Sequence, residues 1–180
     1  MKKTIVGALT AFVAAISLNG AAHAALPVGA KAPDFTAEGA LAGKPFKFHL
    51  AEALKKGPVV LYFFPSAFTK GCTIEAHEFA EAADDFAKAG ATLIGVTAGN
   101  TDRLAAFSKE ACRDKFPVAA VNKETIKAYD AVLALKPDLS DRTSYVIGKN
   151  GKIAFVHSDL SPVDHIKLTL KAAQDLKAKK

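Results

Sequence analysis

The feature that most constrains this 180-residue sequence is an apolar run that leads through a proline-bearing loop to a cysteine. Residues 59–64 (VVLYFF) are typical of a strand buried on both faces. Pro65 ends that run, and Cys72 stands where a helical pattern begins. Free amides and the positive dipole end at a helix start favour the thiolate, the nucleophilic form of cysteine. The order of strand, loop, thiol and helix therefore predicts an α/β fold with a reactive Cys72.

Further strands and amphipathic helices alternate along the chain without a linker or repeat. Besides residues 59–64, strands are predicted at 44–48, 92–97, 117–121, 144–147 and 153–157, the last two as a hairpin. Helices are predicted at 50–55, 72–88, 102–112, 124–132 and 164–177, and a loop at 28–39. This order describes one thioredoxin-like α/β domain, a central mixed sheet flanked by helices.

The first 24 residues have the pattern of a cleaved signal peptide. Two lysines precede an uncharged apolar stretch, residues 5–18, and residues 22–24 (AHA) offer a small-x-small cleavage site. The stretch is shorter than the roughly 20 residues that span a membrane. We expect a mature domain of residues 25–180 in a bacterial periplasm, without a stable membrane anchor; an uncleaved anchor is the alternative.

The net charge of +6 does not indicate a nucleic-acid partner. Lys2 and Lys3 leave with the signal, and the tail at residues 177–180 supplies much of the remainder. No basic stretch carries the interleaved aromatic residues that bind nucleic acids.

Two cysteines, Cys72 and Cys112, remain in the mature chain. An even number in an oxidising compartment usually indicates a disulfide. A permanent bridge here would close a loop of about 40 residues and stabilise the fold by roughly 4 kcal/mol. A domain of this size does not require such a bridge, so a structural disulfide would need another explanation.

Three further residues are candidates for the surroundings of Cys72. The hydroxyl of Thr69 lies within one turn of the sulfur and can both donate and accept hydrogen bonds, although helix capping is its ordinary role. Pro65 stiffens the loop and offers an apolar wall. Arg142 supplies a permanent positive charge with several donors. Sequence spacing cannot place Arg142 beside Cys72, and an arginine near a strand end more often lies at the surface.

Residues 61–76 (LYFFPSAFTKGCTIEA) resemble the peroxidatic motif of peroxiredoxins, and their GCTIEA portion is similar to the bacterioferritin comigratory protein, or peroxiredoxin Q, branch. The resemblance covers nearly all of the mature chain and includes residues 32–35 (APDF) and 142–147 (RTSYVI). It implies a peroxiredoxin-type thioredoxin-like fold. It also implies a thiol peroxidase that reduces hydrogen peroxide and organic hydroperoxides without a metal, flavin or haem cofactor.

The resemblance further implies a role for each motif residue. Cys72 would attack the peroxide and become a sulfenic acid. Pro65, Thr69 and Arg142 would shape the pocket and stabilise the transferring oxygens. Glu75 matches a position that orients the arginine, and an acid placed favourably at a helix start is its alternative interpretation.

The sequence also departs from this branch. Lys70, Phe68 and residues 118–120 (VAA) replace its usual residues, and His77 stands where a second cysteine often lies. His77 lacks the clustered ligands of a metal site, and none is predicted. The resemblance then leaves Cys112 to resolve the sulfenic acid into a disulfide, which a thioredoxin-like protein would reduce. The pair would join only after local unwinding, and Cys112 as a buried bystander is the alternative.

Two other functions stay open. A thiol-disulfide oxidoreductase would need a Cys-x-x-Cys motif, which the sequence around Cys72 lacks. A non-catalytic secreted thioredoxin-fold domain would hold a permanent Cys72–Cys112 disulfide that resists mild dithiols. A monomer and a homodimer are both compatible with the sequence.

Overall fold

The computed structural model describes residues 25–179, so the expected signal peptide lies outside the described residues. Within them a mixed sheet has the strand order β2-β1-β5-β4-β3-β6-β7. The strands are β1 (Thr36–Leu41), β2 (Lys44–His49), β3 (Val59–Phe63), β4 (Thr92–Thr97), β5 (Val118–Ala120), β6 (Thr143–Ile147) and β7 (Ile153–Ser158). The helices are α1 (Leu50–Lys56), α2 (Lys70–Lys88), α3 (Leu104–Glu110), α4 (Lys123–Ala128) and α5 (His165–Ala178).

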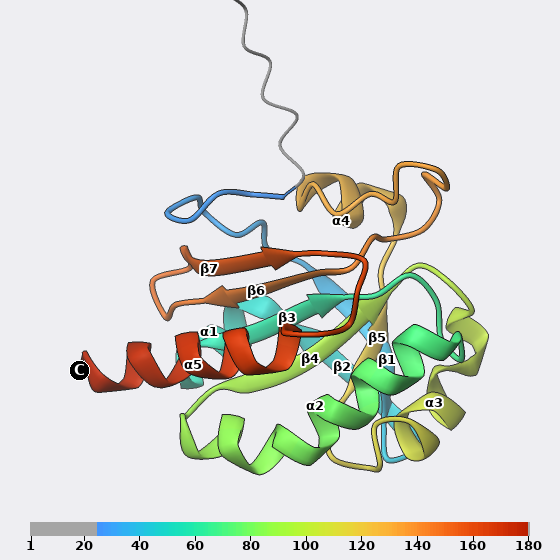
Figure 1. Ribbon diagram of the computed structural model, residues 1–180, viewed down its shortest axis with the longest axis horizontal. Coiled ribbons are helices and arrows are strands. Elements are labelled where there is room, and N and C mark those ends of the chain that lie inside the picture. The colour runs from blue at the N-terminus through green and yellow to red at the C-terminus, as the bar shows by residue number, and fades with distance from the viewer. Residues whose placement is uncertain (1–24, 180) are drawn as a thin grey trace, which may run out of the picture.

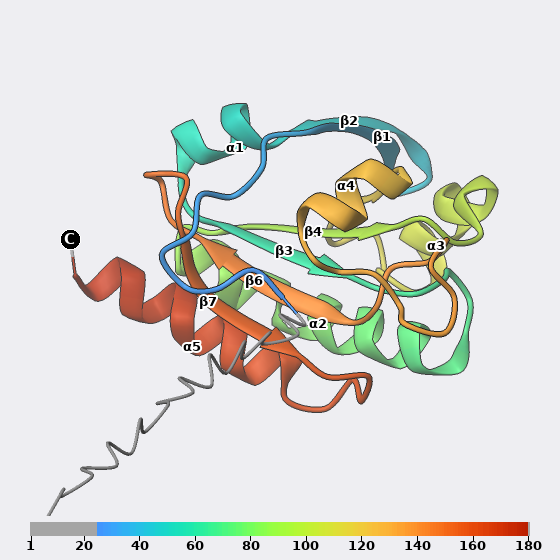
Figure 2. The same cartoon turned by 90° about the horizontal axis from the view of Figure 1, so that it is seen from above.

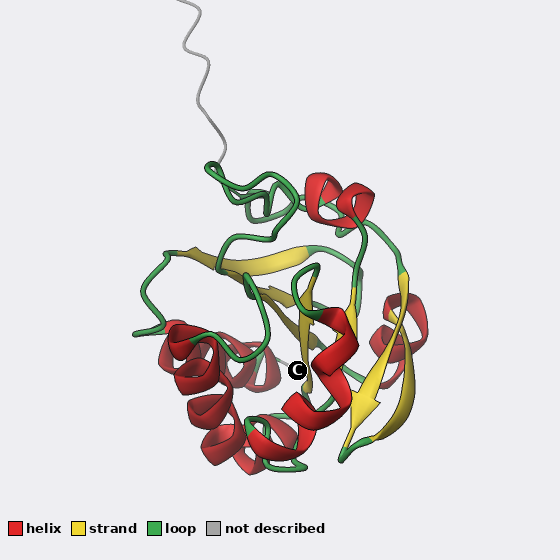
Figure 3. Cartoon of the chain, turned by 90° about the vertical axis from the view of Figure 1, so that its right-hand side faces the viewer, coloured by secondary structure: helices red, strands yellow, loops and turns green. Residues whose placement is uncertain are grey.

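Helices cover both faces of this sheet (Figure 1), with α1 and α4 above it and α2 and α5 below it in Figure 2. The sheet is seen between the two helical layers from a third side in Figure 3. Successive residues of β3 point to opposite faces of the sheet. Tyr62 therefore belongs to the core between the sheet and α2, and Phe63 belongs to the core between the sheet and α4. The side chains of both cores are buried. The predicted thioredoxin-like architecture is confirmed.

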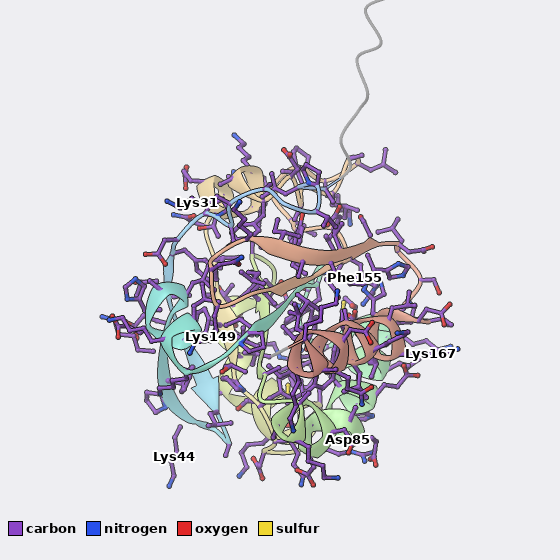
Figure 4. All side chains as sticks on the ribbon, turned by 90° about the vertical axis from the view of Figure 1, so that its left-hand side faces the viewer. Lys31, Lys44, Asp85, Lys149, Phe155 and Lys167 are labelled. Carbon is purple, nitrogen blue, oxygen red and sulfur yellow. The ribbon has the colours of Figure 1, made fainter. Side chains whose placement is uncertain are left out.

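Aromatic side chains anchor α2 to the sheet. The rings of Tyr62 and Phe79 stack with centroids 4.3 Å apart, and both side chains are fully buried. Burial of one such side chain contributes about 1.5–3 kcal/mol. Phe155 of β7 packs against the same core, whereas Lys44 and Asp85 lie exposed at the periphery (Figure 4). The start of α2 is therefore fixed by its packing further along the helix.

The loop predicted at residues 28–39 is wrong at its end, because β1 begins at Thr36. The sequence TAEGAL lacks the alternation and the β-branched residues that mark a strand. Pairing with β2 and β5 forms it instead. Gly39 permits this pairing, since a Cβ there would lie 2.0 Å from the carbonyl oxygen of Val118.

Three helix boundaries also differ from the sequence prediction. The helix predicted from residue 72 begins at Lys70. The helix predicted at 102–112 divides into a 3-10 turn, Thr101–Arg103, and α3, and the one predicted at 124–132 ends at Ala128. Positive φ angles follow both helices, at Arg113 and Asp114 after α3 and at Asp130 after α4. A right-handed helix cannot continue through such residues. Among residues 25–179, no helix is long and apolar enough to cross a membrane.

Candidate active site

The register of the sheet brings Arg142 to Cys72 across 70 residues of sequence. Strands β3 and β6 are antiparallel, with Phe63 opposite Thr143. The residue before β6 therefore lies at the sheet end where the chain leaves β3 for α2. Here Arg142 Nη2 lies 3.6 Å from Cys72 Sγ.

Cys72 occupies the first turn of α2, which begins one residue after the N-cap position, Thr69. The side chain is buried, with 1% of its surface exposed. The sulfur thus lies between two positive features, the N-terminus of a 19-residue helix and a guanidinium. Both features can stabilise negative charge that develops beside the sulfur during a reaction. Because Cys72 is buried, only small molecules can reach its sulfur.

The guanidinium of Arg142 is itself buried and held at further points. Its Nη1 is ion-paired with Oε2 of Glu75, one turn beyond Cys72 on α2, and its Nε donates to the carbonyl of Leu160 at 2.8 Å. Burial raises the pKa of Glu75 to about 8, and the charge of Arg142 opposes that rise. A fixed arginine with one nitrogen facing the thiol is preorganised to stabilise charge at that place.

The loop that carries Pro65 is held by the last residue of β4 and by the chain that follows it. Thr97 Oγ1 donates to the carbonyl of Pro65 at 3.2 Å, and Asn100 Nδ2 donates to the carbonyl of Ala67 at 3.0 Å. Thr69 is exposed, and its hydroxyl donates to the carbonyl of Ser66 at 3.1 Å. Thr69 therefore holds the N-cap position of α2 without the side-chain capping bond of its ordinary role.

Phe68, one of the departures from the branch, has the left-handed φ of +62°, which is unusual for a bulky residue. Its ring packs edge-on against Phe107 of α3 with centroids 5.2 Å apart, and the Arg103 guanidinium lies 4.0 Å above it. These contacts with α3 and the preceding 3-10 turn offset the backbone strain and fix the loop three residues before Gly71.

Cys112 is fully buried and, like Cys72, is a free thiol. It lies in the turn after α3 rather than within the helix predicted for it, and its amide donates to the carbonyl of Phe107 at 3.0 Å. Burial raises the pKa of the Cys112 thiol well above its ordinary range. His77, which replaces the usual second cysteine, lies 3.3 Å from the carbonyl of Glu110 at the end of α3.

Two residues that the sequence did not indicate complete this region, His165 and Ser144. The imidazole of His165 is fully buried, with Nδ1 2.8 Å from Ser144 Oγ and 3.8 Å from Glu75 Oε1. The available signal is weak: His165 and Thr169 share a buried helical face with Ala173, so two polar residues interrupt an apolar stripe.

Comparison with known proteins agrees with this geometry. The model of the AhpC/TSA family matches residues 28–156. Chloroplastic peroxiredoxin Q of Sedum lineare is 35% identical, with 68% of this chain and 67% of the relative covered. The protein of the same name from Arabidopsis thaliana is 34% identical, with 88% and 72% covered.

A solved structure, the peroxidoxin BcpB of Mycobacterium tuberculosis, superimposes with a TM-score of 0.69 at 29% identity, covering 82% of this chain and 96% of that one. Thioredoxin peroxidase I of Plasmodium yoelii has a TM-score of 0.73 at 20% identity over 84% and 91% of the two chains, a likeness of fold alone. The sequence and structural matches agree, and the chain belongs to the AhpC/TSA family as a thiol peroxidase of the bacterioferritin comigratory protein, or peroxiredoxin Q, branch.

Proposed function

We propose that Cys72 is the peroxidatic thiol of this enzyme and that hydrogen peroxide and organic hydroperoxides are its substrates. The observation that carries the proposal is the approach of Arg142 Nη2 to Cys72 Sγ at 3.6 Å. The thiolate attacks one peroxide oxygen, so that an S–O bond forms as the O–O bond breaks. The electron pair leaves on the other oxygen, which takes a proton and departs as water or an alcohol.

Arg142 stabilises the charge that develops on the departing oxygen, and Glu75 holds the guanidinium in place. Pro65 forms the apolar wall of the pocket. Thr69 is exposed at the N-terminus of α2. Its hydroxyl can turn from the Ser66 carbonyl to a bound peroxide.

Cys112 is the proposed resolving thiol. Its sulfur attacks the sulfenic sulfur of Cys72, a disulfide forms, and water leaves. A thioredoxin-like protein then reduces the disulfide by thiol exchange. Because Cys112 is buried and burial raises its thiol pKa, the turn after α3 must open before this step.

The proposed place of this cycle is a bacterial periplasm, reached through a signal peptide of residues 1–24. Expression in a bacterium followed by intact mass measurement of the periplasmic fraction tests it. A chain beginning at Ala25 is the expected product; a full-length chain that remains in the cytoplasm would refute export.

The proposed chemistry is tested on the reduced chain 25–180 by quenched-flow mass spectrometry, because the sequence has no tryptophan to report by fluorescence. Cys72→Ser is expected to abolish the reaction with hydrogen peroxide, since it removes the nucleophile. Cys112→Ser should leave the first oxidation intact and prevent the intramolecular disulfide. Equal, slow oxidation of both thiols would contradict the assignment. A disulfide that mild dithiol fails to reduce would favour the structural alternative.

A further inference from the structure

A buried polar cluster lies next to Arg142. It consists of His165 at the start of α5, Ser144 of β6, Glu75 of α2 and the backbone carbonyl of Asp159. The three side chains of this His165 cluster, those of His165, Ser144 and Glu75, are fully buried. Buried polar groups are costly unless they are paired, so the arrangement calls for a function.

The hydrogen bonds of His165 fix its tautomer. Nε2 lies 3.0 Å from the carbonyl of Asp159, which can only accept, so Nε2 carries the proton. Burial lowers the pKa of His165 to about 4, and the ring is neutral near pH 7. Nδ1 then accepts from the hydroxyl of Ser144. Oε1 of Glu75 is buried without a hydrogen-bond partner. Its other oxygen, Oε2, is ion-paired with Arg142.

The cluster reaches Arg142 through two consecutive carbonyls. His165 holds that of Asp159, and the next one, of Leu160, accepts from Arg142 Nε at 2.8 Å. The amide of Asp159 in turn donates to the carbonyl of Arg142 at 3.1 Å. The Asp159–Leu160 backbone is therefore fastened on one side by the histidine and on the other by the arginine.

We propose that His165 is a positioning residue for peroxide reduction: through the Asp159–Leu160 backbone, it holds the guanidinium of Arg142 so that Nη2 faces Cys72. The inference rests on the proposed roles of Cys72 and Arg142. Loss of the Nε2 donor frees the carbonyl of Asp159. The adjoining carbonyl of Leu160 can then shift, and the guanidinium of Arg142 loses one of its fixed partners. The thiol itself keeps its place on α2.

The test measures the second-order rate constant for Cys72 oxidation by hydrogen peroxide. His165→Leu is expected to lower it about ten- to a hundredfold, the cost of misplacing a group that stabilises the transition state. His165→Gln carries an amide donor near the position of Nε2 and should restore the rate to within about threefold of wild type. Thr169→Val is the matched control, because it removes a buried hydroxyl of α5 that bonds the His165 carbonyl, away from Arg142.

A double-mutant cycle separates positioning from general damage. In an Arg142→Lys background, His165→Leu should change the remaining rate by less than about twofold, because its effect passes through the arginine. An equal loss in both backgrounds, or a wild-type rate for His165→Leu, would overturn the inference. If His165→Leu does not fold, His165→Gln is compared with His165→Asn, whose shorter amide reaches only the Nδ1 position; equal rates would overturn it. A wild-type chain inert to peroxide would refute the proposed function itself.

Discussion

At the scale of single residues, the site depends on one buried cation with several fixed partners. A buried arginine is stable only when its donors are satisfied, and Arg142 meets this condition through Glu75 and the carbonyl of Leu160. The remaining nitrogen, Nη2, is the one directed at Cys72. The resemblance of the motif predicted Arg142 and Glu75 as site residues. It could not show that the guanidinium is also held by the carbonyl of Leu160, which lies 18 residues further along the sequence.

Gly71 is expected to be required for the place of this nitrogen. A Cβ at residue 71 would lie 3.1 Å from Arg142 Nη2, closer than ordinary contact. Gly71→Ala should therefore lower the rate constant for peroxide by about tenfold. It should not lower the melting temperature, since alanine is the better helix former by about 1 kcal/mol.

Thr73→Ala is the control for this substitution, because it also raises helix propensity in the first turn of α2 and lies on the other side of Cys72 in the sequence. It should keep the wild-type rate. A Gly71→Ala variant with unchanged peroxide kinetics would show that the arginine adjusts without cost.

At the scale of elements, the sequence predicted the strands and helices with strong periodicity and missed one strand, β1, which is made by pairing. Residues 59–64, 92–97 and the late hairpin were predicted as strands because their apolar patterns are continuous, and β3, β4, β6 and β7 confirm them. Strand β1 was missed because its partners, not its own residues, create it. The meeting of Arg142 with Cys72 follows from the β3–β6 register, which no local pattern contains.

The turn after α3 is an element whose stability should control disulfide formation. On α2, Glu81 is ion-paired with Arg113, and Asp84 lies 3.5 Å from Lys115. His77 lies on the same face and contacts the carbonyl of Glu110. These contacts tie the turn that carries Cys112 to the helix that carries Cys72.

Arg113→Ala is expected to accelerate the formation of the disulfide after Cys72 has been oxidised. Exposed pairs of this kind contribute about 0–1 kcal/mol, so the gain should not exceed about fivefold. Salt should accelerate the wild type more than the variant, because the variant keeps only the exposed pair of Asp84 with Lys115. Quenched-flow mass spectrometry follows the step, and Lys55→Ala, which breaks the distant exposed pair with Glu52, is the control. A slower disulfide in Arg113→Ala would contradict a restraining turn.

At the scale of the whole molecule, the buried cluster should make stability depend on pH. The groups that face His165 are Glu75 from α2, Arg142 before β6, His157 from β7 and Asp159. The pKa of His165 is about 4 in the fold and ordinarily 6.5, so unfolding takes up a proton between these values. Its stabilising contribution is present above pH 6.5 and is lost as the pH falls toward 4. Glu75 has the opposite sign, with stability lost as the pH rises from 4.5 to about 8.

His165→Gln should therefore lose less stability than wild type between pH 7 and pH 5, by about 1–2 kcal/mol. Chemical denaturation followed by circular dichroism at the two pH values measures this difference, and the contribution of Glu75 is common to both proteins. His77→Gln, on the surface of α2, is the control. Parallel losses in wild type and His165→Gln would contradict a neutral, buried imidazole.

The complete burial of Cys112 has a consequence for survival at high oxidant dose. In the proposed cycle, a newly formed sulfenic acid must wait until the turn opens, and that waiting time does not depend on peroxide. A second peroxide molecule can meanwhile convert it to sulfinic acid, which ordinary thiols do not reverse, and this side reaction accelerates with concentration. The tightness of one turn thus sets the oxidant level above which the protein inactivates itself: the better Cys112 is packed, the lower that level lies.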